Sequence, residues 1–164
     1  MEKYSTDLTL KDYEHLKECL ALAREALLAG DSPFGSILVN GNNEIIARAR
    51  NKVNTVNILS HPEIELAHWA IVNLSTEERA QTTMYTSGEH CPMCAGAQAW
   101  VGIGQLVFLS SAQQLVEWLK EFGVKDSPIH FVPSREIIKG CVIKGPGKGQ
   151  LLEAIKALHK INNS

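Results

Sequence analysis

Long hydrophobic runs are absent from this 164-residue sequence, and so is a strong net charge. No apolar stretch approaches the roughly 18–20 residues that a membrane-spanning helix needs, so no membrane contact is expected. The polar, acidic N-terminal stretch MEKYSTDLTLKDYEHL resembles neither a secretory signal nor a transit peptide, which favours a cytoplasmic location. A net charge of −2 argues against a general nucleic-acid binder.

Internal repeats, low-complexity tracts and long linkers are also missing, so residues 1–164 are expected to form one domain. With 45% hydrophobic and 21% charged residues, the composition is typical of a globular protein with a sizeable core. Charge is uneven only near the C-terminal end, where five lysines accompany a single acid, Glu153. We interpret them as a solvated surface, with a phosphate-binding patch as the alternative. These lysines are Lys139, Lys144, Lys148, Lys156 and Lys160.

Hydrophobic periodicity and turn residues predict strands that alternate with helices after an opening hairpin. The hairpin strands are expected at residues 36–40 and 44–50, around the turn sequence Asn40-Gly41-Asn42-Asn43. Further strands are expected at 82–86, 105–109 and 129–132, and helices at 10–29, 62–73, 91–100, 112–122 and 150–160. This alternation predicts an α/β fold, a three-layer sandwich with a mixed sheet between helices.

Cysteine is scarce, and only Cys91 and Cys94 of the four lie close together, as C-P-M-C. Cys19 lies in an apolar helical stripe and Cys141 begins a strand-like CVI segment, so both are expected to be buried, unreactive thiols. In a chain without a secretion signal, a CxxC pair indicates metal or redox chemistry more than a structural disulfide.

Two short motifs, His61-Pro62-Glu63 and Cys91-Pro92-Met93-Cys94, lie where a loop is expected to enter a helix. Proline is favoured in a first helical turn, which places His61 and Cys91 at or near the N-caps. The positive end of a helix dipole favours the thiolate that binds zinc, and one helical turn returns Cys94 to the face of Cys91.

One nitrogen and two sulfur ligands leave a tetrahedral zinc ion with one open position, as in catalytic sites. Water in that position is acidic enough to lose a proton near neutral pH and to act as a hydroxide nucleophile. Glu63, two residues from His61, is placed to take the proton and pass it to a substrate. The expected cofactor is therefore one zinc ion per chain, held by His61, Cys91 and Cys94.

Each residue alone also fits a simpler interpretation. His61 alone suits an N-cap or surface histidine, and Glu63 suits an acid that complements a helix dipole. The cysteines alone suit half of a structural zinc site, although no second CxxC or HxxxH follows, or a thioredoxin-like redox pair. Together, H-x-E followed after 27 residues by C-x-x-C matches the signature of zinc-dependent deaminases.

Over residues 10–115 the chain resembles the cytidine deaminase-like superfamily, in the branch of guanine, cytosine and tRNA-adenosine deaminases. The similarity includes PFGSILV at 33–39, Arg50-Asn51 and SGEHCPMCAGA at 87–97. The resemblance implies a five-stranded mixed sheet between helices, commonly in a homodimer. It also implies that Asn51 hydrogen-bonds the base, that Phe34 and Gly35 form part of the pocket, and that the Gly88 carbonyl accepts from the departing amino group.

Two positions depart from the resemblance. His90 replaces the proline that usually precedes the first cysteine, and we interpret it as a solvent-exposed bystander; an altered loop or a titratable group beside the metal are the alternatives. Pro62 replaces a residue whose backbone N–H in several relatives donates to a substrate carbonyl, and a proline has no N–H to give.

The favoured function is hydrolytic deamination of a free purine-like base such as guanine, with release of ammonia. The acidic pI near 6.3 and the short chain suit a small molecule better than tRNA. A tRNA adenosine deaminase is the alternative within the class, with the C-terminal lysines as phosphate contacts. A non-catalytic, zinc-stabilised subunit is the alternative from another class. A homodimer is expected through residues 95–103, although packing within one chain explains these residues as well.

Overall fold

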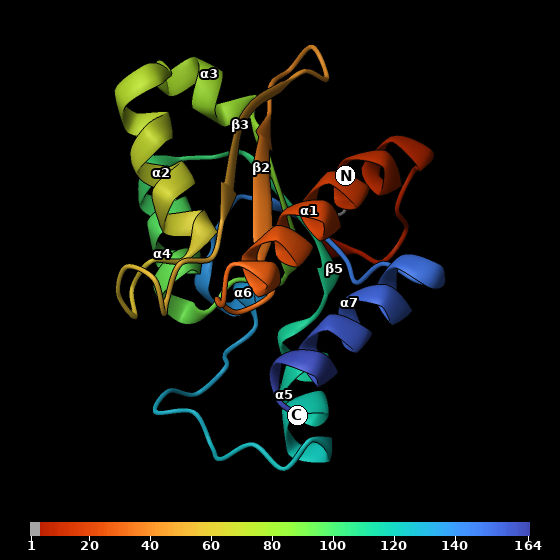
Figure 1. Ribbon diagram of the computed structural model, residues 1–164. Helices are drawn as coiled ribbons and strands as arrows, with labels where there is room; N and C mark the ends of the chain where they lie inside the picture. Colours follow the sequence, from red (N-terminus) through yellow and green to blue (C-terminus); the bar gives the residue numbers. More distant parts are fainter. Residues whose placement is uncertain (1–3) are drawn as a thin grey trace.

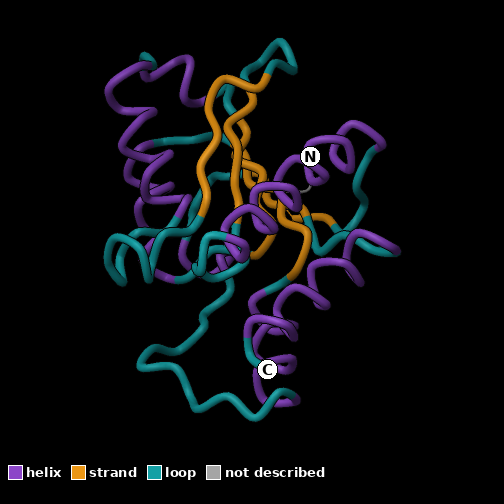
Figure 2. The backbone as a smooth tube through the Cα atoms, viewed as in Figure 1, coloured by secondary structure: helices purple, strands orange, loops and turns teal. Residues whose placement is uncertain are grey.

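A computed structural model describes residues 4–164 and shows one sheet covered by helices on both faces (Figures 1 and 2). The strands lie in the order β1-β6-β5-β4-β2-β3. Their bounds are β1 Tyr4–Ser5, β2 Gly35–Val39, β3 Ile45–Arg50, β4 Thr83–Gly88, β5 Gln105–Ser110 and β6 Val142–Lys144. The helices are α1 Leu10–Leu28, α2 Pro62–Asn73, α3 Thr76–Ala80, α4 Pro92–Val101, α5 Ala112–Glu121, α6 Ser134–Ile137 and α7 Gln150–Asn162.

The mixed sheet begins with the predicted hairpin. β2 pairs antiparallel with both β3 and β4, whereas β4, β5, β6 and β1 run parallel. At the hairpin turn Asn43 has a φ of 62°, and its N–H donates to the Asn40 carbonyl at 3.0 Å. Asparagine tolerates this left-handed conformation better than most residues do, which explains the turn signal in the sequence.

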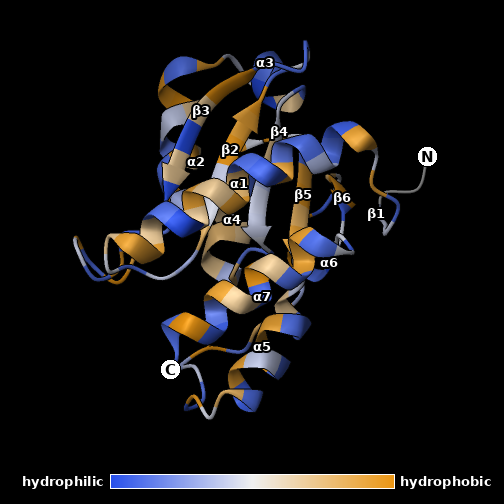
Figure 3. Cartoon of the chain, turned by 45° about the vertical axis from the view of Figure 1, so that its right-hand side comes forward, coloured by the Kyte–Doolittle hydropathy of each residue, from blue (hydrophilic) through white to orange (hydrophobic). Residues whose placement is uncertain are grey.

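Side-chain alternation along the strands builds two cores, one on each face of the sheet. Ile37 and Val39 pack with the core that α1, α5 and α7 cover, whereas Leu38 packs with the core under α2 and α4. Figure 3 shows β2 and β5 as largely hydrophobic strands between helices that carry both hydrophilic and hydrophobic residues. The predicted three-layer α/β sandwich is therefore confirmed.

The expected number of five strands is wrong, because the sheet has six. Residues 129–132 form an irregular segment instead of a strand. Pro128 and Pro133 flank this segment and have no backbone N–H to donate to a neighbouring strand. Because Ile129 is also exposed, the segment lacks both the hydrogen bonds and the burial of a strand. β6 takes that place, immediately after Cys141, and the two-residue β1 pairs parallel with it.

Within residues 4–164, none of the helices combines the length and the apolar character that crossing a bilayer requires.

Candidate catalytic metal centre

The two predicted motifs start two neighbouring helices. His61 is the N-cap of α2 and Cys91 is the N-cap of α4, each with extended backbone and each followed by a proline in the first helical turn. β4 ends at Gly88, three residues before Cys91, so the site lies at the carboxyl end of this strand. The sequence-based placement of both motifs at helix starts is confirmed.

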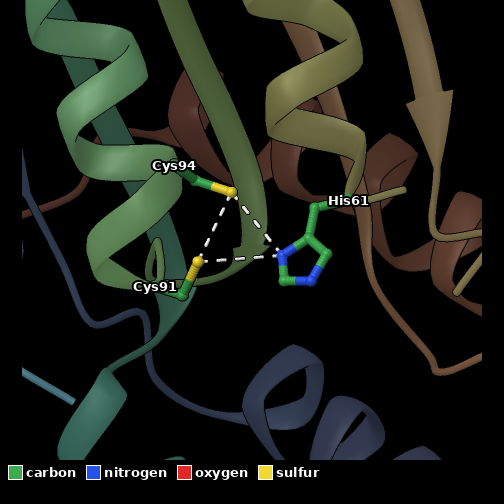
Figure 4. A group of neighbouring side chains, drawn as sticks. All are labelled: His61, Cys91 and Cys94. Atoms are coloured by element: carbon green, nitrogen blue, oxygen red, sulfur yellow. Dashed lines mark hydrogen bonds between the residues drawn. The ribbon is translucent and has the colours of Figure 1, made fainter. Parts of the chain in front are cut away.

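His61, Cys91 and Cys94 converge from these two helix starts into one group (Figure 4). The His61 Nδ1 atom lies 3.7 Å from Cys91 Sγ and 3.6 Å from Cys94 Sγ, and the two sulfurs are 3.5 Å apart. Tetrahedral zinc with ordinary bond lengths needs sulfurs about 3.8 Å apart and nitrogen–sulfur separations of about 3.5–3.6 Å. The donor set and its spacing therefore fit a zinc ion. A thioredoxin-like redox pair would not require a histidine nitrogen beside both sulfurs.

The three side chains of this group share their protons unequally. Hydrogen bonding with Cys94, and then with His61, lowers the pKa of Cys91 to about 4, although burial opposes this shift. Hydrogen bonding with Cys91, burial and the negative charge of Glu63 raise the pKa of Cys94. The hydrogen bond with Cys91 also raises the pKa of His61. A thiolate at Cys91 is thus favoured, the form in which cysteine binds metals.

Glu63 lies in the first turn of α2 and is 5% exposed. Its Oε1 atom is 3.2 Å from the Ser36 hydroxyl and 3.0 Å from the Thr86 hydroxyl. The Thr86 hydroxyl is also 3.0 Å from the Gly88 carbonyl oxygen. Because these contacts hold one carboxylate oxygen, they fix the carboxylate while leaving Oε2 for proton exchange.

Three of the residues expected around the base, Asn51, Phe34 and Gly88, are linked by contacts with one another. Asn51 is buried, its Oδ1 accepts the Val53 N–H at 3.0 Å, and its own N–H donates to the Phe34 carbonyl at 2.9 Å. The Asn51 amide nitrogen is thereby left to donate to a ligand. A Cβ on Gly88 would lie 3.0 Å from the Phe34 ring, so Phe34 and Gly88 are in close contact.

Gly35 has a packing role that the sequence did not reveal. A Cβ at this position would lie 2.4 Å from Leu22 Cβ and 2.6 Å from the Cys19 carbonyl oxygen. Glycine therefore allows α1 to pack closely on the start of β2. The Gly35 N–H donates to the Ser87 hydroxyl at 3.1 Å, which joins the two strands that border the site.

The interpretation of His90 as a solvent-exposed bystander is wrong. His90 is 1% exposed, and its Nε2 atom is 2.7 Å from Gln98 Oε1 on α4. The backbone turn before Cys91 directs this side chain inward, under the helix that Cys91 begins. The sequence around His90 does not reveal whether its side chain points inward, because that orientation depends on where Gln98 and Cys141 lie in the fold.

Three polar residues of the site were missed by sequence reasoning. Ser36 and Thr86 hold Glu63, as described above. Glu89 accepts the backbone N–H of Ala112 at 2.8 Å and that of Ser134 at 2.7 Å, which ties the turn before Cys91 to α5 and α6. The only signal was indirect: Ser36 and Glu89 lie within the quoted segments that resemble deaminases, and Thr86 directly precedes one of them.

Comparison with known proteins finds related deaminases. The MafB19-like deaminase family matches residues 11–144. A Schizosaccharomyces pombe protein named "Probable cytosine deaminase" is 31% identical over 134 residues, which cover 82% of this chain and 80% of that protein. The tRNA-specific adenosine deaminase of Bacillus subtilis is 36% identical over 99 residues, 60% of this chain and 61% of that protein.

The fold also matches a solved structure. The guanine deaminase from Nitrosomonas europaea superimposes with a TM-score of 0.69 at 20% identity, covering 96% of this chain and 86% of that one. The match to the family spans His61, Glu63, Cys91 and Cys94, and the yeast relative is similar over most of its length. The chain therefore belongs to the MafB19-like deaminases within the cytidine deaminase-like proteins, and it is a hydrolase that acts on C–N bonds.

Proposed function

We propose that this deaminase is zinc-dependent and converts an amino-substituted nucleobase, with guanine as the favoured substrate, to the oxo form with release of ammonia. The convergence of His61 Nδ1 and the sulfurs of Cys91 and Cys94 at zinc-ligand spacing carries this proposal. Bound zinc supplies a water molecule of lowered pKa at its open position. The chain's own side chains transfer the protons and orient the base.

Glu63 is the proposed proton carrier. Its carboxylate takes one proton from the attacking water and delivers it to the ring nitrogen of the base. It then takes the second proton from the hydroxyl that has added to the ring carbon and delivers it to the departing amine, so that a carbonyl remains and ammonia leaves. Ser36 and Thr86 support this role because their hydroxyls keep one carboxylate oxygen in place. When the Thr86 hydroxyl donates its hydrogen bond to Glu63, the Gly88 carbonyl is free to accept a hydrogen bond from the amino group that leaves.

Substrate preference is proposed to follow from Asn51 and Pro62. The free amide nitrogen of Asn51 orients the base, and Phe34 covers one side of it. Pro62 is the first residue of α2 and has no N–H to donate to a pyrimidine carbonyl. A buried acceptor without a partner is unfavourable, which supports guanine over cytosine.

Cytosine is the second candidate, since the yeast relative that matches most of its own length is named as a cytosine deaminase. Transfer RNA is a disfavoured substrate, because two of the C-terminal lysines already form ion pairs with acidic side chains. Lys144 forms an ion pair with Asp12 at 3.7 Å and Lys156 with Glu121 at 3.0 Å, which reduces the charge available for phosphates.

The test is ammonia release from guanine, cytosine, adenine and their nucleosides, measured beside the zinc content of the purified protein. We expect one zinc ion per chain and the highest kcat/KM for guanine. A protein without zinc, or zinc-loaded protein that releases no ammonia from any of these compounds, contradicts the proposal. Efficient cytosine turnover with weak guanine turnover selects the second candidate.

A further inference from the structure

His159, near the end of α7, has a buried imidazole that the proposed mechanism does not use. The side chain is 2% exposed, and within residues 4–164 its Nε2 atom has no hydrogen-bond partner. Most buried polar atoms in folded proteins are hydrogen-bonded, and each one left unpaired costs stability. An unpaired nitrogen at this depth therefore indicates a partner that residues 4–164 do not supply.

The position of His159 shows where that partner lies. Its ring is 4.9 Å from the Phe34 ring, centroid to centroid, in an edge arrangement. Phe34 in turn contacts Gly88, whose carbonyl shares the Thr86 hydroxyl with Glu63. In Figure 4 the blue ribbon of α7 runs below the three metal-binding side chains. The imidazole thus packs against Phe34, a residue that is expected to form part of the proposed base pocket.

α7 is anchored well enough to hold this side chain in place. Ile155, one turn before His159, is fully buried in the core, and the Trp118 ring of α5 lies 6.1 Å from the imidazole. At the start of the helix, the Lys148 N–H donates to the Tyr13 hydroxyl at 3.0 Å. The family match ends at residue 144, before α7 begins.

We propose that His159 is a specificity-determining residue whose imidazole hydrogen-bonds the heterocycle bound against Phe34. This inference rests on the proposed function. Burial lowers the pKa of His159 to about 4, so the ring is neutral near neutral pH. A neutral imidazole has one N–H donor and one acceptor nitrogen. An uncharged amino-heterocycle carries the same two kinds of group, whereas a phosphate offers only acceptors.

Two substitutions separate hydrogen bonding from packing. His159→Phe keeps an aromatic ring against Phe34 and removes both nitrogens, whereas His159→Gln restores an amide near the position of Nε2. We expect His159→Phe to raise the KM for guanine about 5- to 150-fold, the range for a lost hydrogen bond, and His159→Gln to recover most of that loss. Without ligand, His159→Phe is expected to keep or raise the Tm, since it removes an unpaired buried nitrogen.

His15→Phe is the matched control. His15 is also a buried histidine, but its Nε2 is paired with Asn43 Oδ1 at 2.7 Å, on α1 and away from the metal ligands. This control should lower the Tm and leave the KM for guanine unchanged. The inference is overturned if His159→Phe keeps the wild-type KM, or if His159→Gln raises the KM as much as His159→Phe does.

A binding measurement keeps this test independent of turnover. In zinc-loaded protein with ¹⁵N-labelled histidine, added guanine should shift the His159 Nε2 resonance, with cytosine as the second probe. If the wild type releases no ammonia, the proposed function fails while a shifted resonance still supports the role of His159. Turnover of guanine without any change at His159 overturns this inference alone.

Discussion

At the scale of single residues, Glu63 carries the proposed proton transfers and is held by Ser36 and Thr86. Glu63→Ala should keep the zinc ion and the fold but lose turnover by about 10²–10⁴-fold or more, the usual contribution of a general acid–base group. Glu65→Ala is the control, because Glu65 lies in the same first turn of α2 but pairs with Lys52 at the surface. Measured kcat and zinc content decide, and a Glu63→Ala enzyme with a tenth of wild-type activity would refute the mechanism.

Pro62 shows how one backbone atom affects the choice of substrate. Pro62→Ala restores an N–H at the start of α2, where an alanine is compatible with the helix. We expect kcat/KM for cytosine to increase roughly 5- to 150-fold, the range for one buried hydrogen bond, and to increase much less for guanine. Equal effects on the two bases would show that the pocket does not use this N–H.

At the scale of elements, the loop between β3 and α2 is held by Asp31, which follows α1. The buried Asp31 carboxylate accepts the N–H groups of Asn54 at 2.8 Å and Thr55 at 2.9 Å, the Thr55 hydroxyl at 2.8 Å, and Arg50 Nη1 at 2.9 Å. This network fixes the segment that leads from Asn51 toward His61. Asp31 therefore positions the site from outside it.

A pH dependence follows from this network. Burial opposes ionisation of Asp31, yet hydrogen bonds from Thr55, Asn54 and Arg50 lower its pKa from 3.8 to about 2. Since the folded value lies below the unfolded one, the ionised carboxylate stabilises the fold above about pH 4, and this contribution is lost as the pH falls toward 2. The difference in unfolding free energy between wild type and Asp31→Asn should thus shrink between pH 5 and pH 2.5. Urea unfolding at both pH values measures it, and a constant difference contradicts the prediction.

The elements also show what could be predicted from the sequence. Proline at the first position of α2 and of α4 marked both helix starts, because this signal is local. Residues 129–132 had the composition of a strand, but pairing in a parallel sheet depends on partners that are distant in the sequence. In the structure it is Val142–Lys144 that pairs with β5. The burial of His90 and His159 was not predictable either, because it depends on contacts with Gln98 on α4 and with Phe34, which precedes β2.

At the scale of the whole molecule, one face carries apolar side chains that residues 4–164 leave uncovered. α2 and α4 lie side by side on this face (Figure 1). Exposed on them are Ile71 at 56%, Val72 at 81% and Trp100 at 92%. Packing within one chain accounts for Val101 and Ile103, which are buried, but it does not account for Trp100.

This face leads us to expect a homodimer through α2 and α4. Tryptophan is prominent among the residues that dominate binding at interfaces, and a stable dimer buries about 800 Å² on each partner. Light scattering at micromolar concentration should therefore give twice the 18.0 kDa chain mass for the wild type and the chain mass for Trp100→Lys. Leu28→Lys is the control, since Leu28 is 89% exposed at the end of α1, on the other layer, and its substitution should leave the dimer intact. A wild-type mass near 18.0 kDa would contradict the prediction and would leave Trp100 an exposed surface residue.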